Sequence, residues 1–145
     1  MEKLKIYLDN CCYNRPFDNQ TQMKIRLETE AKLYIQASVR DGKHWLCWSF
    51  MLDYENDKNP HREKRNIIAP WKDVAVDFCP PSETILSTGK HIMKLGVKNE
   101  DALHIACAIE KNCDFFITTD MKLANKIIKE IRITNPIDFI RETEG

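Results

Sequence analysis

The sequence predicts one α/β domain, built on a parallel sheet with helices on both faces. Short apolar segments alternate with longer segments whose apolar residues recur at helical spacing. One short segment, 115–118, is rich in β-forming residues and apolar on both faces, which is typical of a buried parallel strand. The 145 residues, 43% of them hydrophobic, suffice for a single core, so we expect one domain over 1–145.

The first part of the chain is predicted to form a strand, a loop and a long helix. The strand covers 4–8, and the loop covers 11–20. Asn19 is expected to cap the helix with Gln22 as its reciprocal partner, and Gly42 follows the helix end. Residues at helical spacing are predicted to form its buried stripe: Met23, Leu27, Ala31, Tyr34 and Ser38.

The rest of the chain continues the same alternation. The predicted strands are 45–48, 74–78, 115–118 and 131–133. The predicted helices are 49–55, 61–69, 82–95, one beginning at Asn99, and 123–129, followed by a turn or short helix from Asn135. Ser49, Ser82 and Asn99 are suitable N-cap residues.

Composition limits the possible functions. The chain has 22 basic and 22 acidic residues, so nucleic-acid binding would depend on local basic patches. Six cysteines without a CxxC pair indicate reduced thiols of a cytoplasmic protein and disfavour a zinc site. We find no apolar run typical of a membrane span and no signal peptide.

Four acidic residues are predicted near the carboxyl ends of strands. Asp9 ends the first strand, Asp120 lies just past the end of the strand 115–118, Asp101 begins a helix, and Glu55 lies on the helix after the second strand. Ligands of open α/β sheets bind at this edge, and clustered carboxylates favour Mg²⁺ or Mn²⁺. Simpler roles remain open: a helix-start charge for Asp101, a helix cap for Asp120, and for Glu55 a solvated face shared with nearby acids.

Four segments together resemble the signature of PIN-domain ribonucleases, including the VapC-like members. They are 6–10 (IYLDN), Ser49 with Glu55 six residues later, 101–106 (DALHIA) and 117–120 (ITTD). The resemblance implies a three-layer α/β/α fold with a five-stranded parallel sheet in the order 3-2-1-4-5. It also implies Mg²⁺- or Mn²⁺-dependent cleavage of RNA.

Carried over by position, the resemblance makes Asp9, Glu55, Asp101 and Asp120 the catalytic metal ligands. Asn10 and Thr119 match polar neighbours that hold water or a carboxylate. The chain departs from the pattern at Lys122, where many members carry another acid, and in the longer loop 11–17.

Basic residues near these acids are candidates for contacts with RNA phosphates. Arg15 lies on the loop after Asp9, and the densest basic cluster includes Arg62, Lys64 and Arg65. Such clusters are commonly solvated helix faces. His104 is interpreted as a packed or surface residue with no catalytic role.

The leading hypothesis is a metal-dependent endoribonuclease. It would be either the toxin of a toxin–antitoxin pair, with an antitoxin partner, or a stand-alone RNA-processing protein, and we expect a homodimer. The alternative is a PIN-like module that binds RNA or protein without cleavage. A phosphatase of the haloacid-dehalogenase kind is disfavoured, because it needs a second Asp where this chain has Cys11.

Overall fold

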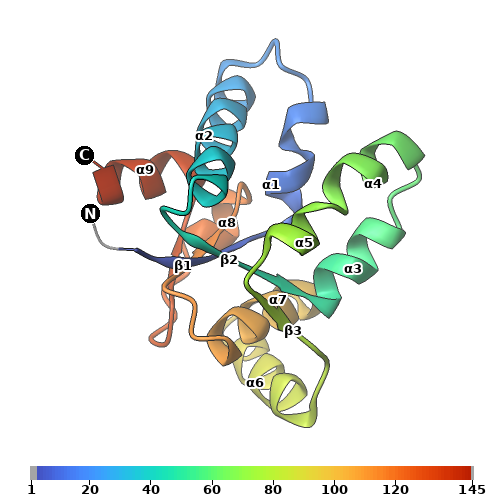
Figure 1. The fold of residues 1–145 in the computed structure, drawn as a ribbon. Coiled ribbons are helices and arrows are strands. Elements are labelled where there is room, and N and C mark those ends of the chain that lie inside the picture. Colours follow the sequence, from blue (N-terminus) through green and yellow to red (C-terminus); the bar gives the residue numbers. More distant parts are fainter. Residues whose placement is uncertain (1–2, 145) are drawn as a thin grey trace.

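Five parallel strands form the centre of the fold in the computed structural model, which describes residues 3–144. Their order is β3-β2-β1-β4-β5, as the resemblance implies. The strands are β1 (Lys5–Leu8), β2 (Trp45–Ser49), β3 (Asp77–Cys79), β4 (Phe115–Ile117) and β5 (Arg132–Thr134). In the central strand, Ile6 pairs with Leu46 on one side and with Phe115 on the other. Figure 1 shows the path of the chain.

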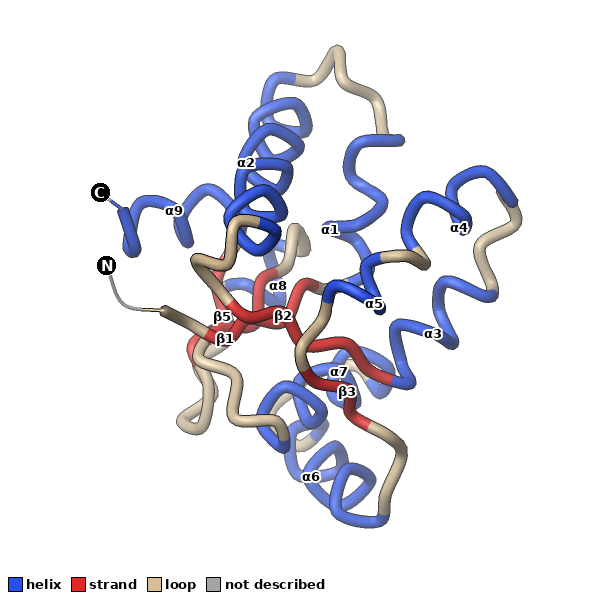
Figure 2. Tube along the Cα trace, in the orientation of Figure 1, coloured by secondary structure: helices blue, strands red, loops and turns tan. Residues whose placement is uncertain are grey.

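Helices cover both sides of this sheet, so the predicted three-layer arrangement is confirmed (Figure 2). Helices α6 and α7 pack together on one side, whereas α2 and α9 pack together on the other. The helical elements are α1 (Asn10–Asn14), η1 (Arg15–Phe17), α2 (Met23–Arg40), α3 (Phe50–Asp57), α4 (Arg62–Ile68), α5 (Trp71–Val74), α6 (Glu83–Met93), α7 (Asn99–Glu110), α8 (Met121–Ala124) and α9 (Pro136–Glu144). Within residues 3–144, no helix has the length and apolar character needed to span a membrane.

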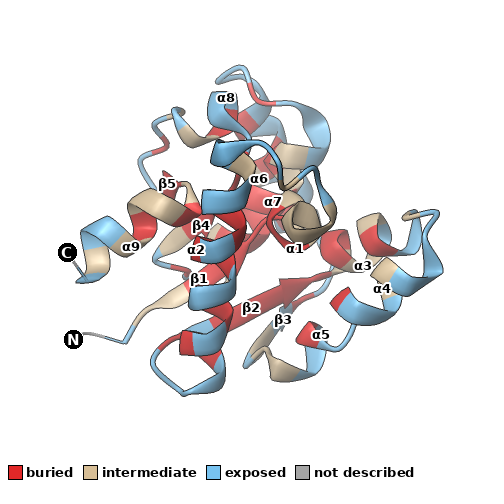
Figure 3. Cartoon of the chain, turned by 90° about the horizontal axis from the view of Figure 1, so that it is seen from above, coloured by how far each residue is buried: buried red, intermediate tan, exposed pale blue. Residues whose placement is uncertain are grey.

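The core is centred on β1 and its neighbours, as the buried residues in Figure 3 show. Ile6, Tyr7 and Leu8 have no exposed surface, and the Tyr7 ring stacks on Phe116 at a centroid distance of 5.3 Å. Removing one such side chain from water stabilises the fold by about 1.5–3 kcal/mol. Burial on both faces explains why these strands lack the alternation typical of half-exposed strands.

The segment predicted as the loop 11–20 contains α1 and η1, so that prediction is wrong. Asp9 begins α1, because its carboxylate accepts a hydrogen bond from the Asn10 amide at 2.8 Å. Cys12 and Tyr13 then bury their side chains against the core. The short helix therefore owes its stability to packing and a cap, neither of which apolar periodicity detects.

Helix α2 begins later and has a different inner face from the one predicted. Asn19 caps no helix; its side chain accepts a hydrogen bond from the Thr21 amide at 3.1 Å, and α2 begins at Met23 without a side-chain cap. Ala31 and Ser38 are buried as predicted, but the predicted stripe residues Met23, Leu27 and Tyr34 are exposed. Several polar residues are buried instead: Glu28, Thr29, Lys32 and Gln36.

Other boundaries shift by a few residues. Residues 71–74 form α5, so β3 begins at Asp77 and not at 74. Helix α8 covers only Met121–Ala124, because an Ile128–Ile131 bridge replaces the end of the predicted helix. Asn99 is the first residue of α7 and not its cap. The predicted caps of α3 and α6 are confirmed: Ser49 accepts from the Leu52 amide and Ser82 from the Ile85 amide.

A buried ion pair explains how the inner face of α2 accommodates Glu28. Glu28 is 1% exposed, and its Oε1 accepts hydrogen bonds from Arg15 Nη2 at 2.8 Å and Nε at 3.1 Å. Arg15 also donates to the exposed Asp18 at 3.0 Å. The pair connects η1 to α2 across the turn that joins them.

Glu28→Gln should lower the free energy of unfolding by about 2 kcal/mol, because it removes a buried charge and leaves the Arg15 guanidinium poorly paired. The measurement is urea denaturation followed by circular dichroism. Asp18→Asn is the matched control and should change stability by less than about 0.5 kcal/mol, since its ion pair is exposed. Equal effects of the two substitutions would contradict this account.

Candidate functional site

The fold brings the four predicted acids to one region at the carboxyl edge of the sheet. Asp9 follows β1, and Asp120 follows the adjacent strand β4, while Asp101 lies in the first turn of α7 and Glu55 on α3. Ligand atoms of Asp9, Glu55 and His104 lie within 4.8 Å of one another. The charges of Asp9, Asp120 and Glu55 all act on Asp101. The arrangement agrees with the topology argument made from the strands.

Several hydrogen bonds fix the Asp9 carboxylate in place. It is 6% exposed, and its Oδ2 accepts hydrogen bonds from Thr118 Oγ1 at 2.8 Å and from Cys11 Sγ at 3.4 Å. Its Oδ1 accepts from the Asn10 amide. These bonds satisfy a buried carboxylate that would otherwise be costly, and they fix its orientation.

The polar neighbours differ in detail from those that the resemblance implies. The hydroxyl that contacts Asp9 belongs to Thr118, and it also accepts a hydrogen bond from the Asp120 amide at 3.1 Å. Thr119 is buried and donates its amide to Cys11 Sγ at 3.4 Å. Asn10 supplies its amide to Asp9, while its side-chain oxygen is buried without a partner among residues 3–144. Thr118 therefore links two of the acids, a role that the sequence analysis did not assign.

His104 belongs to the acidic cluster through Glu55. The imidazole is fully buried; its Nε2 bonds to Glu55 Oε1, and its Nδ1 lies 2.5 Å from Tyr7 Oη. Tyr7 Oη in turn lies 2.6 Å from Ser49 Oγ. Burial lowers the pKa of His104, but the Glu55 hydrogen bond and the nearby carboxylates outweigh it, so the pKa is raised. The interpretation of His104 as packed is correct for its burial but missed this contact, although its place three residues after Asp101 indicated it.

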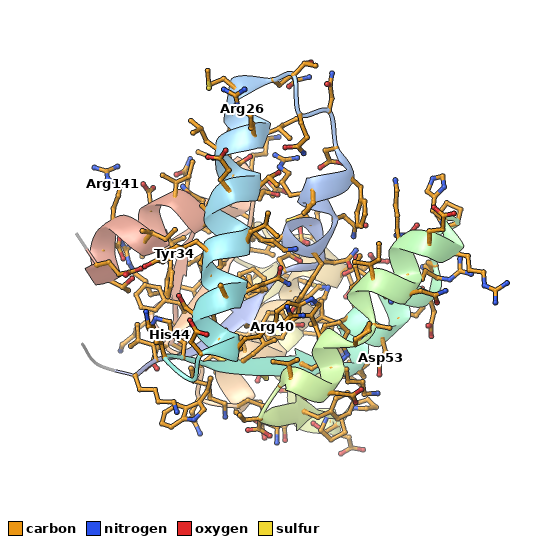
Figure 4. The ribbon with its side chains drawn as sticks, turned by 45° about the horizontal axis from the view of Figure 1, so that its top comes forward. Arg26, Tyr34, Arg40, His44, Asp53 and Arg141 are labelled. Atoms are coloured by element: carbon orange, nitrogen blue, oxygen red, sulfur yellow. The ribbon has the colours of Figure 1, made fainter. Side chains whose placement is uncertain are left out.

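Glu55 is distinguished from its acidic neighbour Asp53 by its partners. Asp53 accepts hydrogen bonds from Trp48 Nε1 at 2.8 Å and Lys72 Nζ at 2.9 Å, so it serves the packing of β2 and α5. Figure 4 labels Asp53. Glu55 instead faces His104 and Asp9. The local sequence could not separate these acids, because both lie on α3.

Asp120 combines a capping role with a place in the site. Its Oδ1 accepts hydrogen bonds from the Lys122 amide at 3.0 Å and the Leu123 amide at 3.4 Å. Its Oδ2 accepts none from the described residues. Asp101 and Asp120 line one pocket of about 490 Å³ together with Lys98, Lys122 and Lys126. The lysines come from two separate segments, so the sequence pattern did not group them with the acids.

The basic residues predicted to contact RNA phosphates differ in whether their side chains already bind other groups of the protein. Arg15 is engaged with Glu28 and Asp18, and the Arg65 guanidinium donates to the Asn59 carbonyl. Lys64 Nζ lies 5.5 Å from the centre of the Phe17 ring, and Arg62 is exposed at the start of α4. Arg62 and Lys64 are thus the more available cations of the predicted set.

Burial and the neighbouring carboxylates both act on the pKa of Asp101. Burial and the charge of Asp9, partly countered by His104, raise the pKa of Asp101 to about 6. Between the unfolded pKa near ~4 and this value, the folded protein binds more protons than the unfolded chain. Stability contributed by Asp101 is therefore lost as the pH rises through this range.

Asp101→Asn should consequently stabilise the metal-free protein at pH 7 by about 1 kcal/mol, after allowance for solvent screening of this half-buried group. Near pH 4 the variant and the wild type should be equally stable. The measurement is denaturation in chelator across this pH range. A stability difference that does not change with pH would show that Asp101 is not titrating as described.

Comparisons with known proteins address the fold. Among solved structures, the chain is similar to one in the crystal structure of VapBC2 from Rickettsia felis bound to a DNA fragment from their promoter. The TM-score is 0.56 at 14% identity, and the match covers 91% of this chain and 98% of the other. No protein-family model and no curated protein matches the chain. The likeness therefore supports the PIN-like three-layer fold, over nearly the full length of both chains.

Proposed function

We propose that this protein is a Mg²⁺- or Mn²⁺-dependent endoribonuclease. The observation that carries the proposal is that Asp9, Glu55 and His104 present ligand atoms within 4.8 Å of one another at the carboxyl edge of a PIN-like sheet, and that Asp9, Glu55 and Asp120 all act on the pKa of Asp101. Carboxylates that approach one another in a half-buried site repel unless cations compensate them.

The residues present fit a hard divalent cation. Their donors are carboxylate oxygens, and the pKa of Asp101 is raised by burial and by the neighbouring carboxylates, partly countered by His104. We assign Asp9, Glu55, Asp101 and Asp120 as the residues that would hold the ion. When bound, it would lower the pKa of a water molecule and stabilise negative charge on the phosphate.

The chain's own side chains would prepare the site for this chemistry. Thr118 and the Asn10 amide fix the Asp9 carboxylate, while Tyr7 and His104 orient Glu55. Lys98, Lys122 and Lys126 line the same pocket as two of the acids and would attract an RNA phosphate. Asn10, Thr119 and the cations Arg15, Arg62, Lys64 and Arg65 stay in the proposal as supporting and RNA-contacting residues.

The proposed partners follow from the fold likeness. The similar structure is a VapBC2 assembly on promoter DNA. We propose that this chain likewise binds a cognate antitoxin, forms a homodimer and acts on RNA in the cytoplasm.

Millimolar Mn²⁺ should raise the melting temperature by about 3–8 °C, because it binds only the folded cluster and relieves the repulsion within it. Asp9→Asn and Asp120→Asn should abolish the shift. Asp53→Asn is the control, since Asp53 lies on the same helix as Glu55 but pairs with Trp48 and Lys72. The measurement is differential scanning fluorimetry with and without metal. An unchanged wild-type transition would rule out the metal site.

The protein should cleave a mixed RNA pool with Mn²⁺, and excess chelator should stop the reaction. Asp9→Asn and Asp120→Asn should each lower the rate by at least about 100-fold, since each removes a ligand charge, and the double variant should lose little more. Asp53→Asn should retain activity. Cleavage that persists in chelator would refute the mechanism, whereas RNA binding without cleavage by the wild type would favour the non-cutting module.

A further inference from the structure

A second pocket, of about 450 Å³, lies on the helical layer that contains α2. It is lined by residues of α1, η1, α2, α4 and α5, and it shares no lining residue with the acidic cluster. Phe17, Leu33, Ile67 and Trp71 supply apolar surface. The volume lies in the range of pockets that bind small organic molecules.

Lys32 lines this pocket with an ammonium that lacks a counter-ion. Its side chain is 5% exposed and forms no hydrogen bond or ion pair with any residue in 3–144. Nζ lies 5.9 Å from the centre of the Tyr13 ring, near the limit of a cation–π interaction. Burial lowers the pKa of Lys32 to about 8. An ammonium without a counter-ion on a largely buried side chain is unfavourable, and an anion beside it would reduce that penalty.

Two further polar groups beside Lys32 are buried and unsatisfied. Tyr13 Oη and Gln36 Nε2 have no hydrogen-bond partner within the described part of the chain. Gln36 lies one helical turn after Lys32, on the same face of α2. All three groups can donate hydrogen bonds. Tyr13 Oη and Gln36 Nε2 are both enclosed by protein, so among these three groups the Lys32 ammonium is the one that a ligand in the pocket can reach.

The rim of the pocket carries one basic and one acidic side chain. Arg40 extends from α2 toward α5, with Cζ 4.4 Å from the centre of the Trp71 ring (Figure 4). Asp41, the acid among the lining residues, is exposed next to the end of α2. The unpaired ammonium of Lys32 therefore favours an anion over a neutral or cationic ligand.

We propose that this pocket binds a small organic carboxylate whose aromatic or apolar body packs against Phe17, Leu33 and Trp71. The carboxylate pairs with the Lys32 ammonium. A single negative charge matches the single buried ammonium. The site is independent of the proposed ribonuclease activity, because none of its residues belongs to the acidic cluster.

The test uses three probes with the same phenyl-alkyl body and an anionic, neutral or cationic head group: 4-phenylbutyrate, 4-phenylbutanol and 4-phenylbutylamine at pH 7. Calorimetric titration should give the carboxylate a Kd at least tenfold lower than that of either other probe. In NMR spectra, the indole N–H signal of Trp71 should shift, whereas the signals of Trp45 and Trp48 should not. Equal affinities for acid and alcohol, no binding of the acid, or no shift at Trp71 would overturn the proposal.

Lys32→Met keeps an unbranched apolar chain and removes the charge. It should bring the affinities for acid and alcohol within about twofold, and it should melt at or above the wild-type temperature, since a buried unpaired charge is lost. Lys24→Met, an exposed position on the same helix, should keep the preference for the acid. A Lys32→Met protein that still prefers the acid would refute the role of Lys32. If that variant fails to fold, the probe series on the wild type decides.

Discussion

Strand β1 is hydrogen-bonded along both edges and buried on both faces, and the surrounding elements must satisfy every polar group that it brings into the core. Its single buried hydroxyl, Tyr7 Oη, meets Ser49 at the end of β2 and His104 on α7. An unpaired phenol at this depth would destabilise the fold by about 1–3 kcal/mol. The same bonds orient His104 toward Glu55, so core packing and site geometry depend on one set of contacts.

The acidic cluster places like charges close together, which is unfavourable for the stability of the fold. Asp9 is well satisfied by Thr118, Cys11 and the Asn10 amide, but Asp101 experiences the charges of the other acids. A protein selected for stability alone would gain by neutral residues here. Such conflicts are typical of functional sites, where side chains are placed for a ligand and not for the fold.

Helix α2 carries two buried charged residues, Glu28 and Lys32, and they differ in whether the protein supplies a partner. Glu28 is paired with Arg15, and this bond also fixes η1 against the helix. Lys32, one turn further along, lacks such a partner within residues 3–144. Because the two residues lie on the same buried face, amphipathicity does not explain the difference. The pocket beside Lys32 accounts for the difference between the two residues, because it leaves room for a counter-ion that the chain itself does not supply.

The sequence by itself determined the layered architecture and the position of most strands. Two-sided apolar segments predict buried parallel strands, and caps such as Ser49 and Ser82 mark helix starts, because both signals depend on residues close together in the chain. The acids Asp9 and Asp120 were identified for the same reason, since each lies within three residues of the end of a strand. Topology then places them at one edge of the sheet.

Only the tertiary structure decided which side chains meet. Thr118 and not Thr119 contacts Asp9, His104 bonds to Glu55, and α2 buries polar as well as apolar side chains. Each of these contacts joins residues far apart in sequence, and periodicity carries no information about the partner. Burial of Glu28 or Lys32 is acceptable only when a particular neighbour or pocket compensates the charge, and that compensation exists only once the helices have packed.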